Sequence, residues 1–494
     1  MKRVAFVWAF AWVALLAGGC TVGPSYEQPT VEMPTAWSGD AAVVGDEGEA
    51  VAGPMASPSV AWWAVFGDPQ LSEMVERAVA GNHDIELARL RVREARAQRQ
   101  AVAGSRWPSV EAGADYRRFR ESETAPRPGQ APTPDTPGSG GQAGGGSQTA
   151  NLFSVGFDAS WEVDVFGGTR RRVEAVDAQV DAAVEGGHGT LLTVVGEVVR
   201  NYVELRGTQR EWATLQETLR LQRRTLELVE RRHAAGLSPR LDVTRAQSQV
   251  ERVEADLPTV RSQLQAGAYR LAVLLGESPT ALLDELLETE PVAWEPVAAP
   301  MGVPSELLRR RPDLRQAERE LAAATAEVGV ATAALYPRLF VIGSAGLESD
   351  AANMLIDAGS GVFAIGPSLS LPLFEGGRLR AELLGEEVRR DAAWVRLEQA
   401  VLLALEEVEA AAARYVQSDR GARRTADVVA STEQSAELAL RLYEQGLSDF
   451  LAVLDAEREL AEARRQQAQR QTAVMVELGA LYKALGGGWA VDDE

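Results

Sequence analysis

The cysteine and the histidines limit the metal and thiol chemistry open to this chain. Its 494 residues include one cysteine, Cys20, and three histidines, His83, His188 and His233, which lie far apart. A disulfide within the chain needs a second cysteine, and zinc sites or Cys–His nucleophile pairs need clustered ligands. We therefore expect no metal site and no thiol catalysis, and we interpret His188 as incidental rather than as a ligand.

The carboxylates are the next candidates, because paired acids can act as general acid and base. They are plentiful, but they lie in helical charge patterns such as Glu406, Glu407 and Glu409, which are typical of solvated helix faces. The chain also has no G-x-x-x-x-G-K-[ST] loop for a nucleotide. We expect no cofactor and no enzymatic activity.

The charge balance argues against a nucleic-acid partner. The chain carries 71 acidic residues against 50 lysines and arginines, a formal net charge of −21 at pH 7. Binding to phosphates needs a basic surface. Apolar residues make up 46% of the chain, which is enough for a folded core.

The lone cysteine fits a secretion and anchoring signal. A short basic start, an apolar run over residues 4–16 and three small residues precede Cys20. This order is typical of a signal peptide and is too short for a membrane span. We expect residues 1–19 to be removed and Cys20 to be lipidated, at the head of an extended segment over residues 20–70. The alternative is an ordinary signal peptide with a chance cysteine.

The elements that must position any site come in two copies. Early residues of the copies match at an offset of 229, as Trp107-Pro108 matches Tyr336-Pro337, and later residues match at an offset of 210. Fixed internal offsets indicate a duplicated unit. We therefore divide the chain into repeat 1 over residues 71–277, a linker over 278–312, repeat 2 over 313–488 and a tail over 489–494.

Each copy contains two segments in which apolar and polar residues alternate. These segments are residues 109–119, 153–165, 338–347 and 362–371. A period of two with one apolar face predicts half-buried strands. About ten residues is the length that crosses a membrane as a tilted strand. A soluble β-sandwich, whose strands alternate in the same way, is the alternative.

Long helices are expected after the strands. The chain has no proline between Trp161 and Ser238, and a helix over about 170–233 would be roughly 95 Å long at 1.5 Å per residue. Apolar residues from Leu191 to Leu205 step by 4, 3, 4 and 3, which predicts coiled-coil-like packing. The glycines around His188 are expected to weaken the helix locally.

Two similar turns are expected where these helices end. Gly236-Leu237-Ser238-Pro239 predicts a glycine C-cap, a serine N-cap and a proline at the first helical position. Gly446-Leu447-Ser448-Asp449 repeats the pattern without the proline. Each turn would join two antiparallel helices into a hairpin.

Four strands are too few to close a membrane barrel. An open edge in lipid leaves unpaired backbone groups, each costing roughly several kcal/mol. Two chains would supply eight strands around a filled interior, whereas three would supply twelve and leave a lumen. The long helices would then extend the duct.

Four parts of the chain resemble outer membrane efflux lipoproteins of the TolC/OprM type, the NodT-like outer membrane factors of tripartite efflux systems. These parts are residues 20–26 (CTVGPSY), 62–71 (WWAVFGDPQL) with 82–84 (NHD), 304–314 (PSELLRRRPDL) and 481–489 (LYKALGGGW). The resemblance covers nearly the whole mature chain.

The resemblance implies an α+β membrane protein that forms a homotrimer. Its 12-stranded transmembrane β-barrel, with four strands per chain, would be continued by a long periplasmic α-helical coiled-coil barrel. A small mixed equatorial region would include residues 278–312. The protein would lie in the outer membrane of a Gram-negative bacterium, with its helices in the periplasm and a lipid anchor at Cys20.

The resemblance also implies partners and a function. The partners would be a periplasmic membrane-fusion adaptor and an inner-membrane pump of the resistance-nodulation-division (RND) class, or of the ABC or MFS class. The protein would be a passive gated exit duct for drugs and other small toxic compounds. The alternatives are a duct for type I protein secretion, a structural coiled-coil lipoprotein and a periplasmic enzyme.

The adaptor-docking residues are expected at the two turns. They are Gly236, Leu237 and Ser238 in the first hairpin and Gly446, Leu447 and Ser448 in the second. Three chains would present six similar tips, which suits a six-fold adaptor ring. The alternative is that these residues serve the turn alone.

The periplasmic gate is expected just after the second turn. Leu451, Asp455 and Arg458 are spaced by 4 and 3 and share one helix face. The resemblance maps the constriction onto them, with Tyr443 as a contact, so that three chains would form an apolar ring and an acidic ring. Arg458, or Arg245 at the repeat equivalent of Asp455, would compensate the acidic ring. The alternative is an ordinary exposed ion pair.

Overall fold

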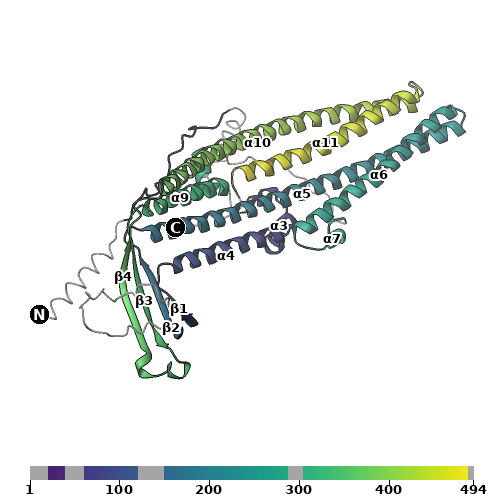
Figure 1. Ribbon diagram of the computed structural model, residues 1–494. Helices are drawn as coiled ribbons and strands as arrows, with labels where there is room; N and C mark the ends of the chain where they lie inside the picture. The colour runs from purple at the N-terminus through teal and green to yellow at the C-terminus, as the bar shows by residue number, and fades with distance from the viewer. Residues whose placement is uncertain (1–20, 39–60, 121–148, 288–303, 488–494) are drawn as a thin grey trace, which may run out of the picture. The chain divides into compact units, whose positions relative to one another are not determined.

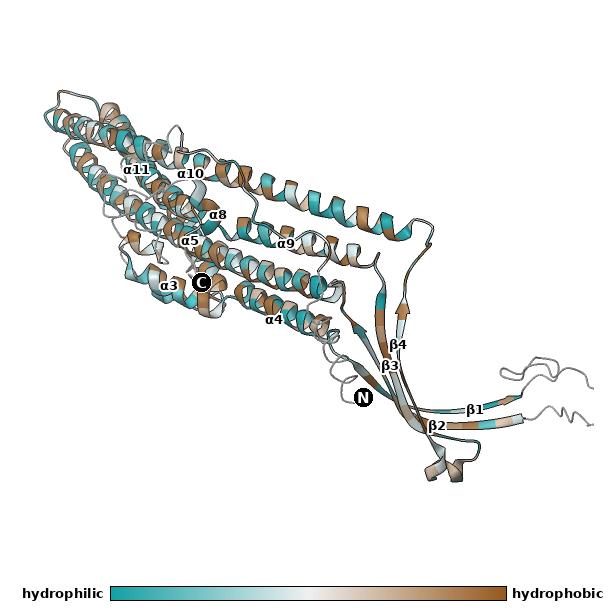
Figure 2. Cartoon of the chain, turned by 90° about the vertical axis from the view of Figure 1, so that its left-hand side faces the viewer, coloured by the Kyte–Doolittle hydropathy of each residue, from teal (hydrophilic) through white to brown (hydrophobic). Residues whose placement is uncertain are grey.

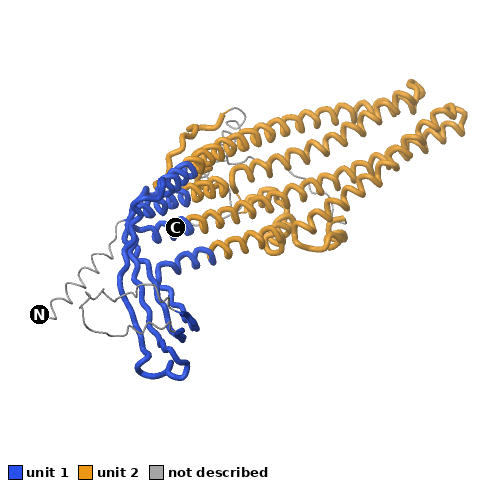
Figure 3. Tube along the Cα trace, in the orientation of Figure 1, with its two compact units in different colours: residues 1–26, 97–177, 322–390 blue, residues 27–96, 178–321, 391–494 orange. Residues whose placement is uncertain are grey.

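The structure is a computed structural model that describes residues 21–38, 61–120, 149–287 and 304–487 (Figure 1). The chain forms two compact units, of which unit 1 comprises residues 1–26, 97–177 and 322–390 and unit 2 comprises residues 27–96, 178–321 and 391–494 (Figure 3). Unit 1 contains the β-sheet, and unit 2 contains most of the length of the paired helices. Cys20 and the expected signal peptide and tail lie outside the described residues.

Unit 1 is built on one antiparallel sheet with the strand order β1-β2-β3-β4. The strands are β1 (Ser109–Arg120), β2 (Thr149–Val163), β3 (Arg338–Ser349) and β4 (Gly361–Ser370). The pairing of β2 with β3 joins the two sequence repeats into one sheet. Within the described residues β1 and β4 each have one strand neighbour, so both outer edges are open.

Strand β2 differs most from the alternating pattern. It begins at Thr149 rather than at residue 153, because its first residues extend the ladder to the end of β1, where Arg120 pairs with Thr149. It ends at Val163 rather than at residue 165, because Asp164 turns to the next helix. The Asp164 carboxylate accepts hydrogen bonds from the backbone N–H groups of Thr169 and Arg170 at 3.1 and 2.9 Å.

The sheet exposes many apolar side chains in the single chain. Val110, Phe157, Phe363 and Ile365 are 65%, 62%, 84% and 78% exposed. Apolar residues are spread along β3 and β4 (Figure 2). Contiguous apolar surface of this kind indicates a face that is covered by lipid or by another chain.

The helices repeat in length at the two sequence offsets. α5 (Gly168–Ala234) and α10 (Arg378–Glu444) have 67 residues each, α6 (Arg240–Leu274) and α11 (Phe450–Ala484) have 35 each, and α4 (His83–Gly104) and α9 (Pro312–Ala333) have 22 each. Both helical hairpins therefore have the same dimensions. None of the helices in the described ranges is long and apolar enough to cross a membrane.

Short helices make up the connecting segments. η1 (Trp62–Phe66) and α3 (Pro69–Gly81) precede α4. The described part of residues 278–312 contains α7 (Leu283–Leu287), η2 (Pro304–Glu306) and α8 (Leu307–Arg310), and η3 (Ala352–Met354) and η4 (Ala358–Ser360) lie between β3 and β4. These elements are much shorter than the long helices.

α5 runs unbroken through the glycine cluster that was expected to weaken it. A Cβ added at Gly186 would meet Gln316 Oε1 at 3.2 Å, so the glycine permits close packing of α9. The adjacent Glu185 is buried and pairs with Arg315 of α9 at 2.7 Å, while His188 Nδ1 lies 3.2 Å from the same carboxylate. Packing between the helices therefore outweighs the low helix propensity of glycine here.

Both turns have the expected glycine C-cap. Gly236 and Gly446 have φ values of 75° and 74°, in the left-handed region that glycine adopts without strain. The N–H of the next residue, Leu237 or Leu447, bonds to the carbonyl five residues back at 2.8 or 2.9 Å. These bonds satisfy carbonyls that the helix end leaves free.

The predicted serine N-caps are wrong. Pro239 and Asp449 occupy the N-cap positions, so each second helix begins one residue later than expected. At the second turn, the Asp449 carboxylate accepts the Ala452 N–H at 3.1 Å, a bond typical of N-caps. At the first turn, Ser238 Oγ instead donates to the Val229 carbonyl at 3.4 Å.

Candidate gate and docking sites on the helical hairpins

Each helical hairpin presents an exposed leucine at its turn. Leu237 is 67% exposed and Leu447 is 71% exposed. An apolar residue after the glycine C-cap often packs against the preceding helical turn, but here most of each leucine side chain is exposed. The predicted docking leucines are therefore accessible, and their contact with an adaptor stays a prediction.

A small apolar core joins the two hairpins next to their turns. Val229 of α5 is buried there with Tyr443 of α10 and Phe450 of α11. The Tyr443 and Phe450 rings are 5.5 Å apart, and the Arg232 guanidinium lies 4.6 Å from the centre of the Tyr443 ring, which is a cation–π distance. The structure thus places the predicted gate contact Tyr443 in this core, where it is 4% exposed.

Three other predicted gate residues, Leu451, Asp455 and Arg458, share an exposed face of α11. Leu451 is exposed, and Arg458 Nη1 lies 3.9 Å from Asp455 Oδ1. This pair is solvent-exposed, and such pairs contribute about 0–1 kcal/mol. If the side-chain amide of Gln249 on α6 is turned so that its oxygen faces Arg458, this oxygen accepts a hydrogen bond from Arg458 Nε at 3.0 Å. The face is open in a single chain, so closure of a duct would require contacts between chains.

Arg245 is the second predicted partner of Asp455. It is half-buried on α6, where it interacts electrostatically with the buried carboxylate of Asp242. Burial raises the pKa of Asp242, whereas the charge of Arg245 lowers it and that of Asp449 raises it. In the single chain, Asp455 is paired with Arg458, and compensation by Arg245 stays a prediction.

A buried charged cluster around Arg206 is not singled out by the sequence. Arg206 of α5 is 2% exposed, and its Nη2 donates to Tyr202 Oη and Gln70 Oε1, each at 2.6 Å. Tyr202 donates to Asp68 Oδ2 at 2.6 Å, and that oxygen lies 3.7 Å from the guanidinium. Burial and the bond to Asp68 raise the pKa of Tyr202. The cluster ties the start of α3 to α5.

A second cluster ties α9 to both helices of the second hairpin. Arg311 Nη1 donates to the Ala484 carbonyl at the end of α11, and Nη2 donates to Asp313 and to Glu407 of α10, all at 2.7 Å. Burial lowers the pKa of Arg311, but the two carboxylates raise it by more. Asp68 and Arg311 both lie in segments that carry the family resemblance. The motifs therefore mark these segments, but the sequence does not reveal that the two residues form buried charged clusters.

Two of the three histidines, His188 and His233, make local contacts. His233 Nδ1 lies 2.8 Å from the Ser238 carbonyl oxygen at the first turn, and His188 lies beside Glu185. In the part of the chain that the structure describes, no three His, Cys, Asp or Glu side chains are grouped to hold a metal ion.

Comparison with known proteins agrees with this geometry. The family model of outer membrane efflux proteins matches residues 74–277 and 303–487. The outer membrane protein OprJ of Pseudomonas aeruginosa is 30% identical over 491 residues, which covers 99% of this chain and 97% of OprJ. The solved outer-membrane channel OprN is 34% identical, with a TM-score of 0.82 over 95% of this chain and 100% of OprN. The open state of the MtrE outer membrane channel of Neisseria gonorrhoeae is 27% identical, with a TM-score of 0.76 over 96% of this chain and 100% of MtrE.

Proposed function

The chain belongs to the family of outer membrane efflux proteins, and from this premise we infer that three copies of it form one gated duct. The protein is the outer membrane channel component of a tripartite efflux pump, and it is not an enzyme. Its α+β fold, with four strands and long paired helices, is that of the solved outer membrane channels.

The open sheet is the observation that carries the inference of three chains. β1 and β4 each leave one edge without a strand neighbour among the described residues, and in lipid each unpaired backbone group costs roughly several kcal/mol. If β4 of each chain pairs with β1 of the next, three chains close a barrel of twelve strands with room for a lumen. Exposed side chains such as Phe363 and Ile365 would then have lipid or a neighbouring chain to cover them.

The mass of the purified protein tests this assembly. Light scattering corrected for detergent is expected to give three times the mass of one chain. A mass of one chain would remove both the barrel and the duct, because the open edges would then have no partner. A mass of two chains would favour an eight-stranded barrel, whose interior side chains fill.

A lipid anchor at Cys20 would place the mature N-terminus at the outer membrane. The support is its position after the apolar run and the small residues of the signal sequence. One acyl-bearing residue contributes about 0.8 kcal/mol per buried CH₂ group. Cys20→Ser should abolish labelling by radioactive palmitate, and a mutant labelled as strongly as the wild type would refute the anchor.

A passive duct has no energy source of its own and therefore needs partners. The sequence has no nucleotide-binding loop, so an inner-membrane pump, most simply of the RND class, would supply the energy and a periplasmic adaptor would join the two. Six tips carrying Leu237 or Leu447 would receive the adaptor ring. The rings of Leu451 and Asp455 would keep the duct closed until the adaptor binds.

Gene deletion followed by an antimicrobial susceptibility panel tests the transport of small toxic compounds. The deletion strain should become sensitive to several unrelated compounds, and the wild-type gene should restore resistance. An unchanged panel together with the loss of a secreted protein from the medium would favour type I protein secretion instead. A co-transcribed adaptor and pump would favour efflux, and a neighbouring toxin gene with an ABC transporter would favour secretion.

A further inference from the structure

A cavity of about 490 Å³ lies within unit 2 between α5, α10 and α11. Its walls combine apolar side chains, among them Leu221, Leu440 and Leu460, with polar groups from all three helices. A volume of this size lies in the usual range of small-molecule sites, roughly 300–1,000 Å³, and such sites are mostly apolar with a few polar groups that fix the ligand. The polar groups therefore decide what the cavity can bind.

Gln222 of α5 has a side-chain oxygen that accepts no hydrogen bond from the described residues. Its side chain is 5% exposed and lines the cavity, yet its Oε1 forms no hydrogen bond with any described residue. Buried polar atoms are almost always paired, because an unpaired one loses its bonds to water without replacement. The oxygen itself has less than 1 Å² of accessible surface, so a donor in the cavity would reach it only after the side-chain amide rotates.

Glu457 of α11 supplies a carboxylate in the same wall. It accepts a hydrogen bond from Thr225 Oγ1 at 2.6 Å, and no described residue forms an ion pair with it. A carboxylate can accept about four hydrogen bonds, so most of its capacity is unused. Burial raises the pKa of Glu457, which indicates that its negative charge is poorly compensated.

The remaining charged groups of the cavity are paired or exposed. Arg464 of α11 pairs with Glu433 of α10 at 2.7 Å, and Glu437 of α10 pairs with Arg441. Arg224 of α5 lines the cavity and is exposed. The wall thus offers the Glu457 carboxylate beside apolar surface, with the buried amide of Gln222 as a second polar group.

We propose that this cavity binds a small organic cation, a protonated amine with an apolar body. The ammonium N–H groups would donate to the Glu457 carboxylate and, after rotation of its amide, to Gln222 Oε1, and the apolar part would lie against the leucines. Charge-assisted bonds of this kind are about twice as strong as neutral ones. Glu457 lies on a different face of α11 from Leu451 and Asp455, so the site is separate from the proposed gate and does not rest on its role.

Fluorescence titration of the purified full-length protein with dansylcadaverine tests the proposal. This probe is a primary ammonium joined to an aromatic body, and its N-acetyl derivative is the matched neutral probe. We expect saturable binding of one dansylcadaverine per chain, above the signal of empty detergent micelles, and at least tenfold weaker binding of the neutral probe. Absence of saturable binding, or equal binding of both probes, would overturn the proposal.

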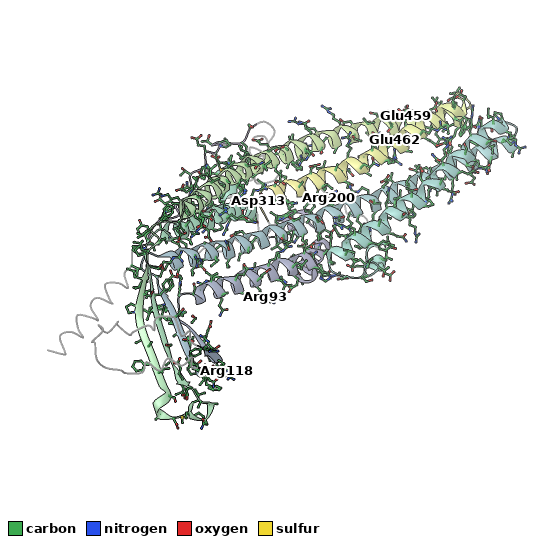
Figure 4. The ribbon with its side chains drawn as sticks, in the orientation of Figure 1. Arg93, Arg118, Arg200, Asp313, Glu459 and Glu462 are labelled. Carbon is green, nitrogen blue, oxygen red and sulfur yellow. The ribbon has the colours of Figure 1, made fainter. Side chains whose placement is uncertain are left out.

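Substitutions locate the binding in the cavity. Glu457→Gln keeps the shape of the side chain and removes its charge, so it should weaken binding at least tenfold, and Gln222→Leu should also weaken it. Glu459→Gln changes an exposed acid two residues further along α11 and should bind like the wild type (Figure 4). Equal affinity in Glu457→Gln and wild type would refute the site. If Glu457→Gln does not elute as the wild-type oligomer, the proposal is tested by the wild type alone. Equal binding of dansylcadaverine and its neutral derivative to the wild type would then refute it.

Discussion

Asp68→Asn should destabilise the packing of α3, because it removes a negative charge that lies beside the buried guanidinium of Arg206. Asn caps a helix about as well as Asp, so the cap that Asp68 provides to the Gln70 N–H at 3.0 Å should persist. The substitution removes the charge of the Asp68 carboxylate, which lies 3.7 Å from the guanidinium. Both side chains are at most 4% exposed, so water cannot replace the lost partner.

The expected magnitude follows from the geometry. At 3.7 Å and an effective dielectric constant of 20, the attraction is roughly 4–5 kcal/mol, and breaking a buried pair from one side costs about 3–5 kcal/mol. Gln70, Tyr202 and Gln209 still accept hydrogen bonds from Arg206, which favours the lower figure. About 3 kcal/mol corresponds to roughly a hundredfold change in a local opening equilibrium.

Hydrogen exchange read by mass spectrometry is the suitable assay, because it reports local opening without unfolding the whole assembly. Amides of α3 should exchange roughly a hundredfold faster in Asp68→Asn. The control is Glu204→Gln, which breaks the exposed pair with Arg200 at 2.9 Å and should change protection by a few tenths of a kcal/mol. A change in α3 no larger than that of the control would show that Asp68 does not compensate Arg206.

The remaining predictions concern the hairpins. Leu237→Asp with Leu447→Asp should keep the trimer and abolish efflux, because only exposed turn residues change; adaptor cross-linking at the wild-type level would count against docking there. Asp455→Ala with Arg458→Ala should raise single-channel conductance in planar bilayers and sensitivity to vancomycin-sized compounds, and wild-type conductance from folded trimers would place closure elsewhere. Because burial raises the pKa of Glu457 above its ordinary value of 4.5, the folded state holds that proton more tightly than the unfolded state. This stabilisation is complete below pH 4.5 and is lost as the pH rises through the raised value. Glu457→Gln should therefore be more resistant to heat than the wild type at pH 7.5 and equal to it near pH 4, and a difference that stays constant with pH would contradict this.

The repeat made much of the helical architecture predictable from sequence. A helix expected over about 170–233 is α5 over 168–234, and its copy α10 has the same 67 residues. Apolar periodicity and the lack of proline are local signals that survive folding. The N-caps were misassigned because Ser238 Oγ bonds to the Val229 carbonyl instead of a helix N–H, and because Asp449 rather than Ser448 caps the second helix. The sequence pattern does not decide the helix start to within one residue.

The buried charges could not be read from the sequence. Arg206 follows a heptad stripe and resembles any solvated arginine on a helix. Its partner Asp68 lies more than a hundred residues earlier, so the pairing depends on the fold. The unpaired oxygen of Gln222 can likewise be recognised only in the folded chain, where α5, α10 and α11 pack together.

The two repeats share one joint at the base of each hairpin. Gly276 and Gly486, which follow α6 and α11, have φ values of 77° and 79°. A Cβ at either position would meet the carbonyl oxygen of Gly81 at 2.1 Å or of Arg310 at 3.0 Å, so both joints require glycine. Gly276 and Gly486 are equivalent at the offset of 210, and Gly81 and Arg310 are equivalent at the offset of 229. Both copies therefore have the same close contact between a glycine and a backbone carbonyl.

The side chains at this joint differ between the copies. Asn82 Nδ2 donates to the Leu274 carbonyl at 2.7 Å, and at the equivalent place Arg311 Nη1 donates to the Ala484 carbonyl at 2.7 Å. The guanidinium has further donors, and it uses them on Glu407 of α10, so the second joint binds three helices with charge-assisted bonds. Both hairpins are thus set at their bases by the same backbone contact, and the hairpin that carries Leu451 and Asp455 is held by the stronger set of side-chain bonds. A gate hairpin anchored in this way would have to bend along its length or near its tip, because its base is fixed.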